Sequence, residues 1–120
     1  NESIMIDGAH STADAKNLAT YLKTIKIPKY GIWAMTKNKE PDLFIKQLKG
    51  VFKSIVTIPI DNERSSVSAK ELNKIAIKNK IKSEMSSNVE EALKKISNNE
   101  KKLIVCFGSL YNCGNILNKN

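Results

Sequence analysis

The sequence predicts a single α/β domain of three layers, in which a mostly parallel β-sheet lies between two layers of helices. Short runs of β-branched and apolar residues alternate with longer segments whose apolar residues recur at helical spacing. The segments between these runs are long enough to contain the crossover helices that parallel strands require. A length of 120 residues, taken as one domain over 1–120, suffices for one sizeable core.

The first half of the chain contains three predicted strands and two predicted helices. A β-favouring run at residues 3–6 stops at Asp7, and the helix that begins near Ala13 carries an apolar stripe at i, i+3, i+4 and i+7. Residues 30–35 predict the second strand, and a helix begins at Pro41 and ends at Gly50. The residues expected to face the core from these helices are Ala15, Leu18, Ala19, Leu22, Phe44, Ile45 and Leu48.

The third and last strands have different predicted environments. Residues 54–60 predict the third strand, in which Pro59 favours an edge position or the strand end. Residues 103–107 are nearly all apolar, which predicts a central strand covered on both faces. Between them, Ile81 and its neighbours allow only a very short strand.

Two further helices have recognisable starts. Ser68 with Glu71, and Asn88 with Glu91, have the spacing of capping boxes, in which each side chain satisfies a free backbone N–H. A short helix is also expected after Gly108. The expected buried residues of these three helices are Leu72, Ile75, Ala76, Val89, Ala92, Leu93, Ile96, Leu110, Ile116 and Leu117.

The formal net charge of +8 does not by itself indicate a nucleic-acid partner. Of the 20 basic residues only Arg64 is arginine, and the lysines are spread along the chain without a dense block. Proteins that read bases and phosphates favour the forked guanidinium of arginine. The sequence therefore predicts a solvated lysine surface and no nucleic-acid binding.

Other classes are disfavoured by composition. No apolar run approaches the roughly 18 residues of a membrane span, and no basic-then-apolar leader is present. The first strand follows residue 1 almost directly, as expected of a domain cut from a longer chain. One histidine with Cys106 and Cys113 matches no zinc-site spacing, so no metal held by this domain alone is expected. No disulfide is expected either, and two free thiols are typical of a protein in a reducing compartment such as the cytoplasm.

The loop after the first strand is the first candidate ligand site, because open parallel sheets bind ligands beyond the carboxyl ends of their strands. Asp7 offers a hydrogen-bond acceptor at the strand tip, Gly8 permits a tight turn, and His10 and Ser11 lie where helix-start N–H groups gather. This combination suits an anionic, hydroxyl-bearing ligand such as a nucleotide. Alternatively, Asp7 and Ser11 only cap the turn and His10 is a surface residue.

The loop after the last strand is the second candidate. Gly108, Ser109 and Tyr111 form a strand–Gly–Ser–helix turn that can present N–H groups and a hydroxyl to a carboxylate or phosphate, although a simple capped turn has the same pattern. Neither loop matches a phosphate-loop or dinucleotide fingerprint. Elsewhere, Tyr30 and Trp33 are expected in the core, and Lys37, Lys39 and Arg64 at the surface.

The order of four segments resembles folylpolyglutamate and dihydrofolate synthases, which belong to the amide ligases that include the cell-wall Mur ligases. The segments are Ile6-Asp7-Gly8-Ala9-His10, Ala34-Met35-Thr36-Lys37-Asn38-Lys39, Ile58-Pro59-Ile60 with Ser68-Ala69-Lys70-Glu71-Leu72, and Val105-Cys106-Phe107-Gly108-Ser109-Leu110-Tyr111. The resemblance covers essentially the whole chain and implies the smaller, Rossmann-like C-terminal domain of such an enzyme.

The resemblance implies an ATP-dependent ligase that uses magnesium and adds L-glutamate to dihydropteroate or to folyl glutamates through an acyl phosphate. It implies that Asp7, His10 and Ser11 contact the nucleotide, and that the turn of Gly108, Ser109 and Tyr111 faces the reaction centre and seats glutamate. The partner would be an N-terminal ATPase domain that holds ATP and Mg²⁺, so the chain alone is expected to be inactive.

Two departures bear on these expectations. The family usually continues its signature with Asn and Pro, where this chain has Ser11 and Thr12. The family also usually has an arginine-bearing segment just before the first strand, and the sequence given does not include that segment. A Mur-type ligase domain and a free-standing module that binds a small anion or a protein are the alternatives. The turn that contains Ser109 and Tyr111 argues against the Mur-type reading.

Overall fold

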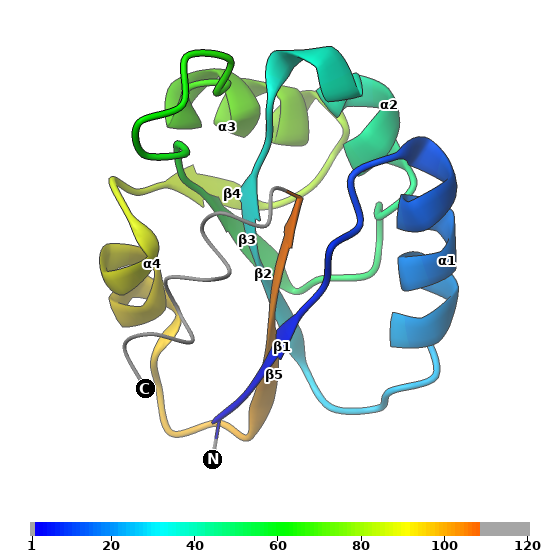
Figure 1. The fold of residues 1–120 in the computed structure, drawn as a ribbon. Helices are drawn as coiled ribbons and strands as arrows, with labels where there is room; N and C mark the ends of the chain where they lie inside the picture. Colours follow the sequence, from blue (N-terminus) through cyan, green and yellow to red (C-terminus); the bar gives the residue numbers. More distant parts are fainter. Residues whose placement is uncertain (1, 109–120) are drawn as a thin grey trace.

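The computed structural model describes residues 2–108, which form a wholly parallel sheet with the strand order β1-β5-β2-β3-β4 (Figure 1). This confirms the predicted α/β class. The strands are β1 (Glu2–Ile6), β2 (Lys29–Ala34), β3 (Ser54–Thr57), β4 (Ser83–Met85) and β5 (Lys102–Gly108). Strand β5 lies between β1 and β2, so the most apolar run is central, as predicted.

The helices form two unequal layers on the sheet (Figure 1). Apolar residues of α1 (Thr12–Leu22), α2 (Pro41–Lys46) and α3 (Ala69–Lys78) pack in one cluster against one face. Those of α4 (Val89–Ile96) pack in a second cluster against the other face. Because every crossover is parallel, all loops that leave the strands gather at one edge of the sheet, here called the carboxyl edge. No helix among residues 2–108 is long and apolar enough to cross a membrane.

Stacked aromatic rings fill the first cluster. Phe107 stacks on Trp33, Phe44 and Phe52 with ring centroids 6.4, 6.0 and 5.2 Å away. Gly31 makes room for them, since a Cβ there would lie 2.8 Å from the Phe107 ring. The expectation that Trp33 and Tyr30 belong to the core is confirmed, with exposures of 0% and 7%.

The predicted helix starts are present. Ser68 Oγ accepts from the Glu71 N–H at 3.1 Å, and Asn88 Oδ1 accepts from the Glu91 N–H at 2.9 Å. In a complete capping box the backbone N–H of the N-cap residue also donates to the glutamate carboxylate, and this second bond is absent at both starts among the hydrogen bonds of residues 2–108. Each device is therefore a single-sided N-cap.

Several boundaries differ from the predicted ones. Strand β3 ends at Thr57, before Pro59, and is an interior strand, so the strand-end interpretation of that proline is right and the edge interpretation is wrong. Strand β4 begins at Ser83, two residues after the buried Ile81. Helix α2 ends at Lys46, and Gly50 lies in the following turn with φ +81°. The expected final helix, with Leu110, Ile116, Leu117 and Cys113, lies outside the described residues.

Lys102 departs from the solvated lysine surface, because its side chain is fully buried at the amino end of β5. Its Nζ donates to the Ile96 carbonyl at 3.0 Å and to Asn98 Oδ1, lies 3.7 Å from Glu2 Oε2, and sits 5.4 Å from the centre of the Tyr30 ring. A buried ammonium is tolerated when its donors are satisfied. These contacts tie the start of β1 to the loop before β5.

Candidate functional site

The two predicted site loops are brought together because β1 and β5 are neighbours in the sheet. The Asp7 N–H donates to the Cys106 carbonyl at 3.0 Å, and the Gly108 N–H donates to the Ala9 carbonyl at 3.1 Å. Asp7, His10 and Ser11 therefore lie on the carboxyl edge, directly beside the end of β5. The rest of the predicted second loop, Ser109 and Tyr111, lies outside the described residues.

Asp7 shapes its own loop. Its Oδ1 accepts from the Ala9 N–H at 2.7 Å, and Ala9 is buried. This is the turn-capping role that the sequence offered as an alternative to ligand binding. The second carboxylate oxygen, Oδ2, has no hydrogen-bond partner within residues 2–108, so capping and ligand binding are compatible.

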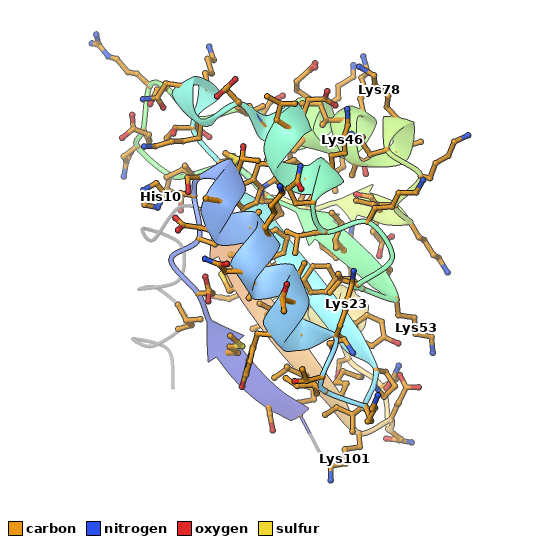
Figure 2. The ribbon with its side chains drawn as sticks, turned by 90° about the vertical axis from the view of Figure 1, so that its right-hand side faces the viewer. His10, Lys23, Lys46, Lys53, Lys78 and Lys101 are labelled. Carbon is orange, nitrogen blue, oxygen red and sulfur yellow. The ribbon has the colours of Figure 1, made fainter. Side chains whose placement is uncertain are left out.

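His10 is exposed at the N-terminal end of α1, as Figure 2 shows. Its Nδ1 lies 2.7 Å from the Gly8 carbonyl oxygen. A carbonyl oxygen can only accept, so Nδ1 must carry the proton, and the neutral ring presents Nε2 as an acceptor. When the ring is protonated, Nε2 becomes a donor suited to an anion.

The first turn of α1 is closed by its own residues. Ser11 Oγ accepts from the Asp14 N–H at 3.1 Å. The pKa of Asp14 lies below its ordinary value because the Ser11 hydroxyl and backbone groups of His10 and Ser11 bond its carboxylate, with the charge of His10 adding to the effect. A negative charge in the first turn also interacts favourably with the positive, N-terminal end of the helix dipole. Ser11 is therefore an N-cap whose hydroxyl is already engaged within its own helix.

A pocket of about 380 Å³ opens beside this loop. It is bounded by the loop that begins with Asp7 and by one face of α1, and its lining residues are Asp7, Gly8, Ala9, Asp14, Asn17, Leu18 and Tyr21. The sequence patterns did not single out Asn17 or Tyr21. The signal that could have found them is their i+3 and i+7 spacing from Asp14, which places all three on one helix face.

Gly108 ends β5 in a conformation that needs glycine. Its φ is +98°, and a Cβ on it would lie 1.9 Å from the Ala34 carbonyl oxygen. The glycine therefore lets β5 approach β2 closely at the carboxyl edge while its N–H holds the Ala9 carbonyl.

The other candidates remain at the surface. In a short 3₁₀ turn (Lys37–Lys39), Lys37 is exposed and Lys39 is half-buried, and Arg64 is exposed in the loop that precedes α3. Lys37 borders a second pocket of about 480 Å³, between that turn and the start of α3. Within residues 2–108, no three histidine, cysteine or acidic side chains gather closely enough to hold a metal ion.

Comparison with protein families finds a match over residues 1–119 to the model for the C-terminal domain of dihydrofolate synthetase. A search of curated proteins finds no match.

Solved structures of similar fold come from several bacteria. Folylpolyglutamate synthase of Mycobacterium tuberculosis, complexed with ADP and AMPPCP, matches 97% of this chain with a TM-score of 0.84 and 20% identity. FolC of E. coli, in complex with DHPP and ADP, matches 97% with a TM-score of 0.82 and 17% identity. The bifunctional folylpolyglutamate synthase/dihydrofolate synthase of Yersinia pestis, complexed with AMPPNP and Mn, matches 97% with a TM-score of 0.81 and 19% identity. The chain spans only 29%, 28% and 28% of these three proteins, respectively.

Proposed function

The chain belongs to the family of dihydrofolate synthetase C-terminal domains, and from this premise we propose that it serves an ATP-dependent ligase that joins L-glutamate to dihydropteroate, to folyl glutamates, or to both. One observation carries the proposal. The loop with Asp7 and His10 projects from the carboxyl edge beside the end of β5, with an unpartnered carboxylate oxygen among residues 2–108 and an exposed imidazole.

The proposed reaction has two steps, phosphorylation of a carboxylate and then formation of an amide. A substrate carboxylate oxygen attacks the γ-phosphorus of ATP, which forms an acyl phosphate and releases ADP. The amine of glutamate then attacks the acyl carbon and gives up a proton, so that an amide forms, and inorganic phosphate leaves with the electrons of the acyl C–O bond and takes up that proton. Positioning and exclusion of water are the main protein contributions to such steps.

In this scheme the residues of the chain bind and orient the nucleotide. Asp7 Oδ2 accepts a hydrogen bond from a nucleotide hydroxyl or amine, and His10 Nε2 approaches the phosphates. Ser11 holds the helix start that carries His10. The solved relatives with bound ADP, AMPPCP or AMPPNP support a nucleotide ligand for this fold. The turn that contains Gly108, Ser109 and Tyr111 is proposed to seat glutamate.

Residues 2–108 contain no group of three or more histidine, cysteine or acidic side chains that could hold a metal ion. Because the chain spans 29% or less of the three relatives described, we assign ATP and Mg²⁺ mainly to an N-terminal ATPase domain of the same cytoplasmic protein. The present domain then acts as a lid that closes on the nucleotide and excludes water.

The test uses the full-length protein that contains this chain, with dihydropteroate or a folyl glutamate as acceptor. We expect ADP release that requires both the acceptor and glutamate, and no release from the 120-residue chain alone. Asp7→Ala and His10→Ala should each lower kcat/KM for ATP by roughly tenfold or more, as loss of a hydrogen bond to a charged or polar ligand does.

Lys70→Ala is the matched control, because Lys70 lies on α3, away from the β1–α1 loop. Its kcat/KM should remain within about twofold of the parent protein. Glutamate-independent ADP release, or full activity in both site variants, would contradict the proposal.

A further inference from the structure

The loop that contains His10 is fixed on its β5 side by backbone hydrogen bonds. The Ala9 N–H donates to Asp7 Oδ1 at 2.7 Å, and the Ala9 carbonyl accepts from the Gly108 N–H at 3.1 Å. Ala9 is also buried. Both backbone groups of the residue before His10 are therefore occupied, and this side of the loop has little freedom to move.

The other side of His10 depends on how the start of α1 is held (Figure 2). Ser11 is the N-cap, and its Oγ accepts from the Asp14 N–H at 3.1 Å. The first helical residue is Thr12, whereas α2 begins at Pro41, whose ring fixes its own backbone. Helix α1 has no such ring at its first position, so side-chain contacts must define where it begins.

The Asp14 side chain is placed to provide those contacts. It is half-buried and lines the same pocket as residues 7–9, so it lies against the loop. The pKa of Asp14 is lowered first by the Ser11 hydroxyl and then by the backbone of His10, as expected of a carboxylate that accepts hydrogen bonds from both. With the bond from the Asp14 N–H to Ser11, this is the reciprocal pairing of a capping box, with aspartate in place of glutamate.

We infer that Asp14 is a positioning residue for His10, which keeps the imidazole at one place on the carboxyl edge by fixing the backbone on its α1 side. The Gly8 carbonyl oxygen lies 2.7 Å from Nδ1 and orients the ring, so Nε2 points in a defined direction only while this backbone is fixed. The role of Asp14 rests on the proposed function, in which Nε2 approaches the phosphates. Asp14 itself is assigned no contact with the nucleotide.

The test is a double-mutant cycle on the full-length protein, with kcat/KM for ATP as the readout. Asp14→Ala should lower kcat/KM by roughly fivefold, because a misplaced binding group loses much of its effect while still present. In a His10→Ala background the same change should cost less than about twofold, since no imidazole remains to be positioned. A residue that only stabilises the helix would lower kcat/KM equally, or not at all, in both backgrounds.

Two conservative variants separate position from charge. Asp14→Glu introduces the glutamate of the usual capping box, and Asp14→Asn keeps an acceptor oxygen but removes the negative charge. Both should retain kcat/KM within about threefold of the parent protein. If Asp14→Asn is as impaired as Asp14→Ala, the charge and not the position is what matters, and the positioning role is refuted.

Glu91→Ala is the matched control. Glu91 lies three residues after the N-cap Asn88 of α4, as Asp14 does after Ser11, and α4 follows β4 at the opposite edge of the sheet from β1. Amide hydrogen exchange in residues 9–14, measured by mass spectrometry, should speed up in Asp14→Ala. Glu91→Ala should leave both this exchange and kcat/KM as in the parent.

The possible failures are distinguishable. Parent-like exchange in Asp14→Ala, or equal kinetic losses with and without His10, would overturn the positioning role while glutamate-dependent ligation by the parent still stands. A parent protein that releases no ADP with acceptor and glutamate present would overturn the proposed function and the role of Asp14 together.

Discussion

Gly108→Ala should destabilise the domain far more than an ordinary glycine substitution, for two separable reasons. The residue has φ +98°, a conformation that costs an L-residue roughly 1–2 kcal/mol. Its new Cβ would also lie 1.9 Å from the Ala34 carbonyl oxygen. Real Cβ atoms keep at least 3.0 Å from such neighbours, so the backbone of β2 or β5 must shift, at a further cost of roughly 1–3 kcal/mol.

Gly50 supplies the matched control. It also has a positive φ, +81°, but apart from its two chain neighbours nothing among residues 2–108 lies within 4 Å of the position that a Cβ would take there. Gly50→Ala should therefore show only the conformational cost of roughly 1–2 kcal/mol. The difference between the two variants isolates the crowding at Ala34, and for a domain of ordinary stability, roughly 5–15 kcal/mol, it is readily measured.

The assay is urea unfolding followed by tryptophan fluorescence. Trp33 is the single tryptophan of the chain, is fully buried and stacks on Phe107, so its emission reports loss of the core next to the altered strand end. Both variants should unfold at lower urea than the parent with an unchanged slope. Equal losses of stability in Gly108→Ala and Gly50→Ala would refute the reasoning, since the close contact would then carry no energy.

Three further predictions concern stability. Lys102→Ala should lower the free energy of unfolding by roughly 2–4 kcal/mol because it leaves a cavity and unpaired acceptors, whereas Lys102→Met should lose less; urea titration measures both. Ser68→Ala should lower it by about 1 kcal/mol through loss of the α3 cap, and Lys70→Ala is the control. The pKa of Glu100 is lowered, first by the Tyr30 hydroxyl and then by Lys53, so its contribution is present above the unfolded pKa near 4.5 and is lost as pH falls through the folded value. Glu100→Gln should therefore lose less stability than the parent between about pH 6 and about pH 3, and an identical pH dependence would contradict this assignment.

Much of the fold follows from local sequence signals. The stripe of Ala15, Leu18, Ala19 and Leu22 is buried as predicted, because helical spacing alone places these side chains on one face. The apolar run at 103–107 is central because only a strand covered on both faces can bury every side chain. In both cases, the residue pattern that predicts the helix or strand also predicts which of its side chains are buried.

Features set by distant partners are beyond prediction from local patterns. Lys102 is one of many lysines, and its burial depends on acceptors from Glu2, Ile96 and Asn98, which only the folded sheet brings together. The close approach of Gly108 to Ala34 likewise depends on β5 lying next to β2. Composition and spacing cannot encode contacts that arise from strand order.

The candidate site divides in the same way. Asp7 and His10 are predictable at a strand tip because the glycine turn that follows a strand is a local signal, and they lie there. Ser11 matches the same signal, yet its hydroxyl caps α1. Asn17 and Tyr21 escape such prediction because a polar stripe on a surface helix is also the ordinary sign of solvent exposure.

The arrangement of the sheet bears on how such a lid would work. A domain that closes over a ligand can orient that ligand only if the loop that contacts it is rigidly attached to the rest of the domain. Here that loop is held at Asp7 by its bond to β5 and at Ala9 by Gly108, while the opposite end of β1 is held by Lys102 through Glu2. Strand β1 is therefore anchored to β5 at both ends, although it lies at the sheet edge. Weakening either anchor should leave the chemistry of Asp7 and His10 intact and instead broaden the positions they occupy, which predicts a raised KM for ATP in the full-length Lys102→Met variant with little change in the pH profile of kcat.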